Sequence, residues 1–143
     1  MKRTSKAEQI ELLGNVSLFS ECSKKELGQV ASMMQERRVE SGSLLTREGE
    51  DGDEFFVVAE GLADAVIGGK KVGSIKPGSF FGEMALLDQG PRVATVTAKL
   101  PTRVLVLDAK GFARVVRDSP SVALKVMKTL AERLRALETS PTR

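Results

Sequence analysis

The stretch from Gly82 to Arg92 combines residue types that can bind a phosphorylated sugar. Gly82 lets the backbone approach a ligand closely. Residues 83–87 form a short run of helix formers, and the free N–H groups at the start of such a turn can bind an anion. Arg92 follows a rigid Gly90-Pro91 turn, so its guanidinium can face the same anion. Glu83 accepts hydrogen bonds when ionised, which suits a sugar hydroxyl.

Each of these features is common when it stands alone, because a lone arginine usually lies on the surface and a Gly-Pro turn often precedes a strand in a hairpin. The combination is more specific. It matches a singly charged phosphate fused to a ribose.

Composition excludes several other functions. The 143 residues carry 22 Lys+Arg and 19 Asp+Glu, a net charge of +3, with no histidine and a single cysteine, Cys22. A metal enzyme or one with a histidine base is therefore not expected, and neither is an internal disulfide. The mild charge and the absence of Trp and Tyr argue against nucleic-acid binding. No apolar run is long enough to cross a membrane, and no signal peptide is visible. We expect a cytoplasmic protein that is not an enzyme, with Cys22 as a small packing residue.

Glycines indicate the fold class. Ten of the 13 lie between Gly42 and Gly90, separated by short runs rich in Val, Ile, Phe and Leu. Such short strands with frequent turns are typical of an antiparallel sandwich or barrel. The imperfect alternation of residues 103–108 predicts a strand that is buried on both faces. The predicted strands are residues 37–40, 43–46, 54–59, 63–67, 71–75, 94–98 and 103–108.

Helices are expected on both sides of these strands. Ser5 with Glu8, and Ser23 with Glu26, fit the capping box that begins a helix. Asp108 can cap a helix over residues 109–117, and the Ser119-Pro120 pair begins a last helix that ends near residue 138. The apolar residues of this last helix, at four- and three-residue spacing, predict either packing onto the sandwich or a short seam for a partner helix: Ala123, Met127, Leu130, Leu134 and Leu137.

The stretch FGEMALL, followed after a short spacer by PRVATV, resembles the phosphate-binding cassette of the cyclic nucleotide-binding domain family. Gly42, Gly61 and Gly78 match structural glycines of that family. The resemblance covers residues 18–137 and is closest to bacterial cyclic-nucleotide-gated channels and protein kinase A regulatory subunits. It implies an α+β fold, with a jelly-roll-like β-roll of about eight antiparallel strands, N-terminal helices, a short cassette helix and two C-terminal helices. The expected divisions are an N-terminal helix at 1–17, the binding domain at 18–138 with residues 120–138 as a lid, and a tail at 139–143.

The resemblance also implies roles for individual residues. Arg92 would pair with the cyclic phosphate, and Glu83 would accept from the ribose 2′-hydroxyl. The N–H groups of Ala85 and Ala94 would complete the phosphate cradle. The remaining expected contacts are Gly82 and Met84 at the ribose, Val93 beside Arg92, Val72 and Ile75 at the base, and Leu130, Arg133 and Leu134 as lid residues.

Val93 bears on the choice of purine. In the family, a threonine at this position favours cyclic GMP, and valine cannot donate a hydrogen bond, so cyclic AMP is the expected ligand. We therefore predict a stand-alone cyclic AMP-binding regulatory protein whose C-terminal helices shift on binding. The effector protein is unknown, no membrane or nucleic-acid partner is expected, and a homodimer through the last helix is possible. The alternative is a domain that keeps the fold without the ligand and serves as an interaction or oligomerisation module.

Overall fold

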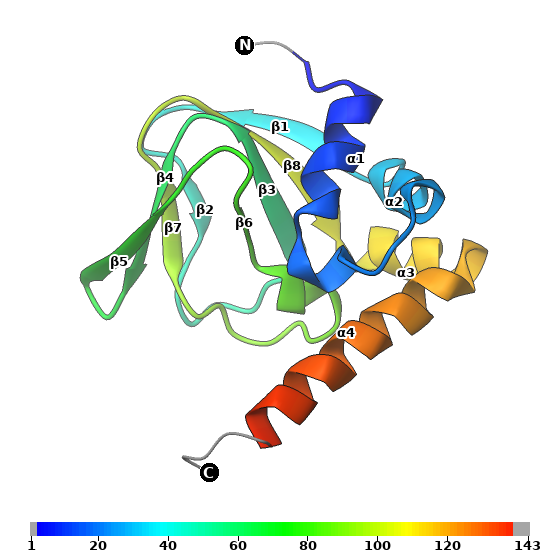
Figure 1. The fold of residues 1–143 in the computed structure, drawn as a ribbon. Helices are drawn as coiled ribbons and strands as arrows, with labels where there is room; N and C mark the ends of the chain where they lie inside the picture. Colours follow the sequence, from blue (N-terminus) through cyan, green and yellow to red (C-terminus); the bar gives the residue numbers. More distant parts are fainter. Residues whose placement is uncertain (1–2, 139–143) are drawn as a thin grey trace.

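The computed structural model describes residues 3–138, so the expected tail at 139–143 lies outside the described residues. Helices stand on both sides of the strands in sequence, yet they gather on one side of the β-roll (Figure 1). The helical segments are α1 (Lys6–Gly14), the 3-10 turn η1 (Ser17–Phe19), α2 (Lys24–Ala31), α3 (Ala109–Asp118) and α4 (Pro120–Glu138).

Side-chain caps explain where these helices begin. The Ser5 hydroxyl accepts from the Glu8 N–H at the start of α1. At the start of α2 the capping box is complete, because Ser23 and Glu26 each accept from the other's backbone N–H. The Asp108 carboxylate accepts from the Gly111 N–H and begins α3. The predicted caps at Ser5, Ser23 and Asp108 are confirmed, with both halves of the capping box present at Ser23 and only the serine half at Ser5. The helix α4 begins at Pro120, as the Ser119-Pro120 pair predicted.

Eight antiparallel strands form two four-stranded sheets, which confirms the predicted α+β fold with a β-roll. One sheet has the order β1-β8-β3-β6 and the other β2-β7-β4-β5. The prediction missed the two-residue strand β6, which pairs with β3. The strands are β1 (Gln35–Val39), β2 (Leu44–Thr46), β3 (Glu54–Glu60), β4 (Ala63–Ile67), β5 (Lys70–Ile75), β6 (Phe80–Phe81), β7 (Thr95–Ala98) and β8 (Thr102–Asp108).

Strands β3 and β8 separate two apolar clusters. Their side chains alternate, so Phe55 and Leu105 join the large cluster formed with the helices, whereas Phe56 and Val104 face the interior of the roll. All side chains from Thr102 to Leu107 are buried, which confirms that β8 is covered on both faces. The large cluster includes residues of α1, η1 and α2, so these elements pack on the same core as the strands.

The predicted apolar stripe of α4 packs onto the core only in part, through Leu130. The buried side chains of α4 are Val122, Val126 and Thr129. Each residue turns a helix by about 100°, so a buried face containing Val122 and Val126 leaves the stripe largely in solvent. Among the stripe residues, Met127, Leu134 and Leu137 are exposed. The packing interpretation of the stripe is therefore wrong for these three residues. Figure 1 shows the C-terminal end of α4 extending beyond the elements that it packs on.

Candidate functional site

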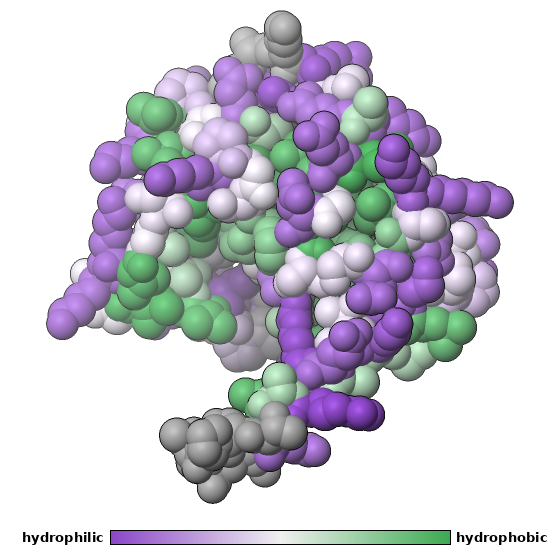
Figure 2. All heavy atoms as spheres, in the orientation of Figure 1, coloured by the Kyte–Doolittle hydropathy of each residue, from purple (hydrophilic) through white to green (hydrophobic). Residues whose placement is uncertain are grey.

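A cavity of about 420 Å³ opens beside the segment that follows β6. This volume lies within the range of roughly 300–1,000 Å³ that small-molecule sites occupy. Figure 2 shows the surface hollowed near the lower edge of the roll, next to a group of hydrophobic side chains. The lining residues come from β2, β6, β7, the turn η2 (Glu83–Leu86) and the loop between η2 and β7. They are Thr46, Phe81, Gly82, Glu83, Met84, Ala85, Asp88, Gly90, Pro91, Arg92, Val93, Ala94 and Val96.

Gly82 begins η2 in a conformation that only glycine adopts readily. Its φ is +80°, in the left-handed region, where a side chain costs about 1–2 kcal/mol. A Cβ at this position would lie 2.7 Å from Arg92 Nη1 and 3.0 Å from the Glu54 carbonyl oxygen. The turn continues with the Ala85 N–H donating to the Gly82 carbonyl at 3.0 Å. Gly82 thus lets the cassette backbone and the Arg92 guanidinium lie in direct contact.

The Arg92 guanidinium is held by a carbonyl and an aromatic ring. Its Nη2 donates to the Glu54 carbonyl oxygen at 2.7 Å, and its Cζ lies 5.8 Å from the centroid of the Phe56 ring. Desolvation by burial lowers the pKa of Arg92, while the nearby carboxylates of Glu54 and Asp53 act in the opposite direction. Within residues 3–138, Arg92 forms no ion pair with a carboxylate at 4.0 Å or less. Its charge therefore remains available at the cavity wall.

Two phenylalanines connect the cassette to the sheet. Phe56 on β3 is directly opposite Phe81 on β6, and the rings stack with centroids 4.7 Å apart and an angle of 12° between their planes. Phe81 immediately precedes Gly82 in the chain. The stack therefore supports both Arg92 and the start of η2. The sequence analysis gave neither ring a role, although Phe81 is the first residue of the FGEMALL motif. The sequence feature that could have indicated these rings is a pair of phenylalanines in a chain that has no Trp or Tyr.

The family model described as "Cyclic nucleotide-binding domain" matches residues 36–119, which is more than half of the chain. The chain belongs to this family. The resemblance stated from these residues is therefore confirmed. The cavity lies at the FGEMALL and PRVATV stretches on which that resemblance was based.

Curated relatives include both classes that the resemblance indicated. A type II regulatory subunit of cAMP-dependent protein kinase from Drosophila melanogaster is 35% identical over 114 residues, covering 80% of this chain and 30% of the relative. A cyclic nucleotide-gated potassium channel from Rhizobium etli is 34% identical over 123 residues, covering 86% of this chain and 34% of the relative. The chain thus spans about a third of the length of these relatives.

Solved structures show the same fold. The N-terminal domain of a transcriptional regulator from Streptomyces coelicolor has a TM-score of 0.82 and 27% identity, covering 89% of this chain and 92% of that one. The regulatory domain of Toxoplasma gondii PKA, solved with cAMP, has a TM-score of 0.70 and 29% identity, covering 89% of this chain and 50% of that one.

The structure brings most of the expected contact residues of the cyclic nucleotide-binding domain together. Seven of them line the cavity, namely Gly82, Glu83, Met84, Ala85, Arg92, Val93 and Ala94. The two residues expected at the base, Val72 and Ile75, are not among the lining residues. Val72 is 58% exposed on β5, and Ile75 packs against the cluster inside the roll. Sequence reasoning also missed lining residues from elements other than the cassette, above all Thr46 on β2.

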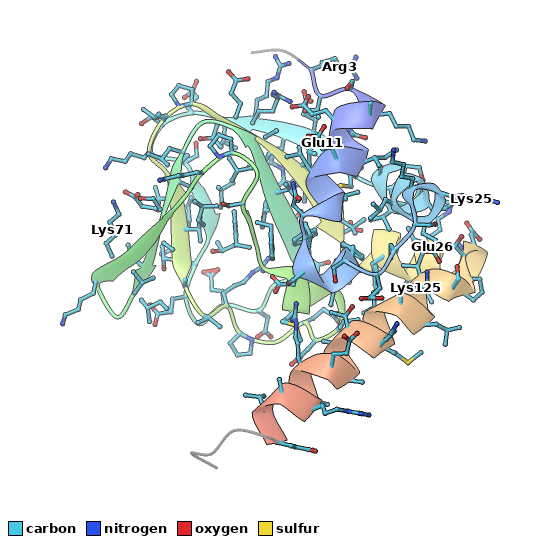
Figure 3. The ribbon with its side chains drawn as sticks, in the orientation of Figure 1. Arg3, Glu11, Lys25, Glu26, Lys71 and Lys125 are labelled. Carbon is cyan, nitrogen blue, oxygen red and sulfur yellow. The ribbon has the colours of Figure 1, made fainter. Side chains whose placement is uncertain are left out.

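The expected lid residues also lie away from the cavity lining. Leu130 packs against the helical core, the Arg133 guanidinium donates to the Ser17 hydroxyl, and Leu134 is exposed. The helix α4 is instead tied to α2 and to the turn before α2 by two ion pairs, Lys125–Glu26 at 2.9 Å and Lys128–Glu21 at 3.3 Å. Figure 3 labels Glu26 and Lys125 where α2 meets α4.

Glu26 is the anchor of this junction. Its side chain accepts from the Ser121 hydroxyl, from the Ser23 N–H and from the Lys125 ammonium group, in this order of effect, and these contacts lower its pKa from 4.5 to about 2. The neighbouring Cys22 is half-buried against the helical core, and burial raises its thiol pKa to about 11. These positions agree with the prediction of a packing role for Cys22.

The described part of the chain offers neither a cluster of metal ligands nor a helix that could span a membrane. Residues 3–138 hold no group of three or more His, Cys, Asp or Glu side chains that could bind a metal ion. None of the helices there is both long and apolar enough to span a bilayer.

Proposed function

We propose that this domain binds cyclic AMP non-covalently in the cassette cavity and makes or breaks no covalent bond. The observation that carries the proposal is the position of Arg92. Its guanidinium lines the cavity, touches the Gly82 position and has a carbonyl rather than a carboxylate as its partner. A singly charged cyclic phosphate supplies the missing negative charge through charge-assisted hydrogen bonds.

The other lining residues take the remaining polar groups of the ligand. Glu83, at the first position of η2, accepts from the ribose 2′-hydroxyl, and Gly82 and Met84 border the sugar. The Ala94 N–H adds to the phosphate cradle. The Ala85 N–H already donates to the Gly82 carbonyl, so it serves the phosphate as a shared donor.

The purine lies toward Val93. This side chain is 75% exposed and borders the cavity, so it offers an apolar surface without a hydroxyl. That favours cyclic AMP over cyclic GMP in our proposal. Relatives whose names or descriptions include cAMP, such as the Toxoplasma gondii domain, support the same choice. In this proposal Val93 takes the base contact predicted for Val72 and Ile75, because that pair lies outside the cavity lining.

Regulation follows from α4. The helix reaches the ligand only if its C-terminal half moves toward the cavity, so Leu130, Arg133 and Leu134 act as a lid in a closed state. We propose that cyclic AMP favours this closed state and that an effector protein reads the change. Such a shift is a change in populations, driven by the difference in ligand affinity between the two states.

Calorimetric titration of cyclic AMP and cyclic GMP into the full chain, with 5′-AMP as the open-phosphate control, tests the binding. We expect cyclic AMP to bind most tightly. Hydrogen exchange of the α4 amides with and without ligand tests the lid. Absence of heat and of a thermal shift at millimolar cyclic AMP would contradict the proposal.

A second function has its own support. The exposed face of α4 carries Leu124, Met127, Leu134 and Leu137, an apolar surface suited to another helix. It favours an interaction or oligomerisation module, including a dimer through the last helix. Light scattering with and without cyclic AMP distinguishes the two functions, since a module that has lost its ligand would self-associate or bind a partner irrespective of the nucleotide.

A further inference from the structure

Two arginines contact the same glutamate at the edge of the cavity. Arg37 on β1 forms a two-pronged ion pair with the Glu54 carboxylate, with Nη2–Oε2 at 2.8 Å and Nη1–Oε1 at 3.3 Å. Arg92 donates to the main-chain carbonyl of Glu54 at 2.7 Å. Glu54 therefore presents its carboxylate to one arginine and its carbonyl to the other.

The Phe56 ring joins the two arginines. The Cζ atom of Arg37 lies 5.9 Å from the ring centroid, and that of Arg92 lies 5.8 Å from it. Arg92 also borders a second, smaller cavity of about 210 Å³, which is lined by acidic residues of the loop before β3. These are Glu50, Asp51 and Asp53, and Glu54 at the first position of β3 also lines the cavity. A guanidinium at this boundary can face the cassette cavity or the acidic side.

We propose that Arg37 is a positioning residue for anion binding, because it holds the Glu54 carboxylate away from Arg92. The inference rests on the proposed function of the cassette cavity. An unpaired carboxylate beside a half-buried guanidinium forms a charge-assisted pair with it. Without Arg37, the Glu54 side chain competes with the phosphate for Arg92, and Arg92 turns toward the acidic loop.

Four proteins test the proposal by calorimetric titration with cyclic AMP: the parent, Arg37→Ala, Glu54→Gln and the double variant. We expect Arg37→Ala to weaken binding about fivefold in the parent, a coupling of ordinary size for groups in one network. In the Glu54→Gln background the same change should have little effect. Thermal unfolding should stay nearly unchanged, because partly exposed ion pairs contribute little to stability.

Arg38→Ala is the matched control. Arg38 is adjacent on the same strand, its side chain is 46% exposed against 42% for Arg37, and it also pairs with a glutamate, Glu36. We expect this variant to bind cyclic AMP as the parent does. Equal weakening by Arg38→Ala would mean that only the overall charge matters, which overturns the proposal. Weakening by Arg37→Ala that persists in the double variant overturns it too.

A ligand-free measurement separates this proposal from the proposed function. In a crystal structure of the Arg37→Ala variant, we expect Arg92 to form an ion pair with the Glu54 carboxylate. Arg92 still bound only to the Glu54 carbonyl would overturn the proposal. That test is independent of cyclic AMP binding, whereas absence of binding by the parent would contradict the proposed function alone.

Discussion

Arg92 and Lys125 are both partly buried cations at a boundary between elements, but they meet different partners. Arg92 contacts a carbonyl and an aromatic ring. Lys125 contacts the carboxylate of Glu26 at 2.9 Å and the carbonyl of Glu21 at 3.2 Å. The charge of Lys125 is compensated within the fold, whereas the charge of Arg92 is directed at a cavity. The comparison separates cations that hold helices together from a cation that is available to a ligand.

The sharpest test of this difference replaces each cation with alanine. Arg92→Ala should weaken cyclic AMP binding by at least about tenfold, because a hydrogen bond to a charged group contributes about 1.5–3 kcal/mol. Lys125→Ala should lower the melting temperature without weakening binding, since it leaves the buried Glu26 carboxylate without its ammonium partner. Calorimetry and thermal unfolding of both variants measure the two effects. Tight cyclic AMP binding by Arg92→Ala would contradict the assignment of the cassette.

The contact between Gly82 and Arg92 gives a second test at the cavity. Gly82→Ala should both destabilise the chain and weaken binding, because the left-handed backbone costs about 1–2 kcal/mol with a side chain and the new Cβ would lie 2.7 Å from Arg92 Nη1. A loss of this size lowers the melting temperature by about 2–8 °C. Thermal unfolding and calorimetry check both parts.

Gly73→Ala is the control for this variant. A Cβ at Gly73 on β5 meets no heavy atom within 4 Å, and its φ is not in the left-handed region. It should therefore leave affinity and melting temperature close to those of the parent. Equal behaviour of the two alanine variants would show that the contact between Gly82 and Arg92 is unimportant.

The same contrast explains what the sequence could predict. The cassette and the capping box of Ser23 and Glu26 are local patterns, so their positions follow from neighbours in the chain. The stack of Phe56 on Phe81 and the contact of Arg92 with Glu54 join residues 25 and 38 positions apart, and no local pattern encodes them. The two-residue strand β6 has no periodicity to detect.

Burial of α4 could not be predicted for a different reason. Two apolar faces share this helix, one with Val122 and Val126 and one with Met127 and Leu134. The sequence favours the second face, because its apolar side chains are larger than valine and recur at four- and three-residue spacing. Packing of α4 on η1 and α3 buries the first face in the large apolar cluster, and the ion pairs of Lys125 and Lys128 accompany that packing. Which face of α4 is buried therefore depends on contacts between residues far apart in the sequence, which only the structure shows.

The junction of α2 and α4 can be tested through the pH dependence of stability, because it contains Glu26. Its carboxyl pKa is lowered from 4.5 to about 2 in the folded chain, so it stabilises the fold above pH 4.5 and loses this contribution as the pH falls from 4.5 toward 2. Glu26→Gln should lower the melting temperature at pH 7 and flatten its decline across that interval. Glu11→Gln, an exposed change of equal charge on α1, is the control (Figure 3). An unchanged pH profile in Glu26→Gln would contradict the role of the Glu26 carboxylate as acceptor for Ser121, Ser23 and Lys125.

The smallest effect is expected at Val93, which borders the cavity and is not part of the buried core. Val93→Thr adds a hydroxyl that can accept a hydrogen bond from the 2-amino group of guanine, a group that adenine lacks. A neutral hydrogen bond contributes about 0.5–1.5 kcal/mol, so cyclic GMP should gain about two- to tenfold in affinity relative to cyclic AMP. Since the side chain is 75% exposed, the melting temperature should not change. Competition between the two nucleotides measures the ratio, and Val93→Ala shows what removing bulk alone does. If Val93→Ala shifts the ratio as much as Val93→Thr, the purine is selected by the width of the cavity and not by a hydrogen bond at this position.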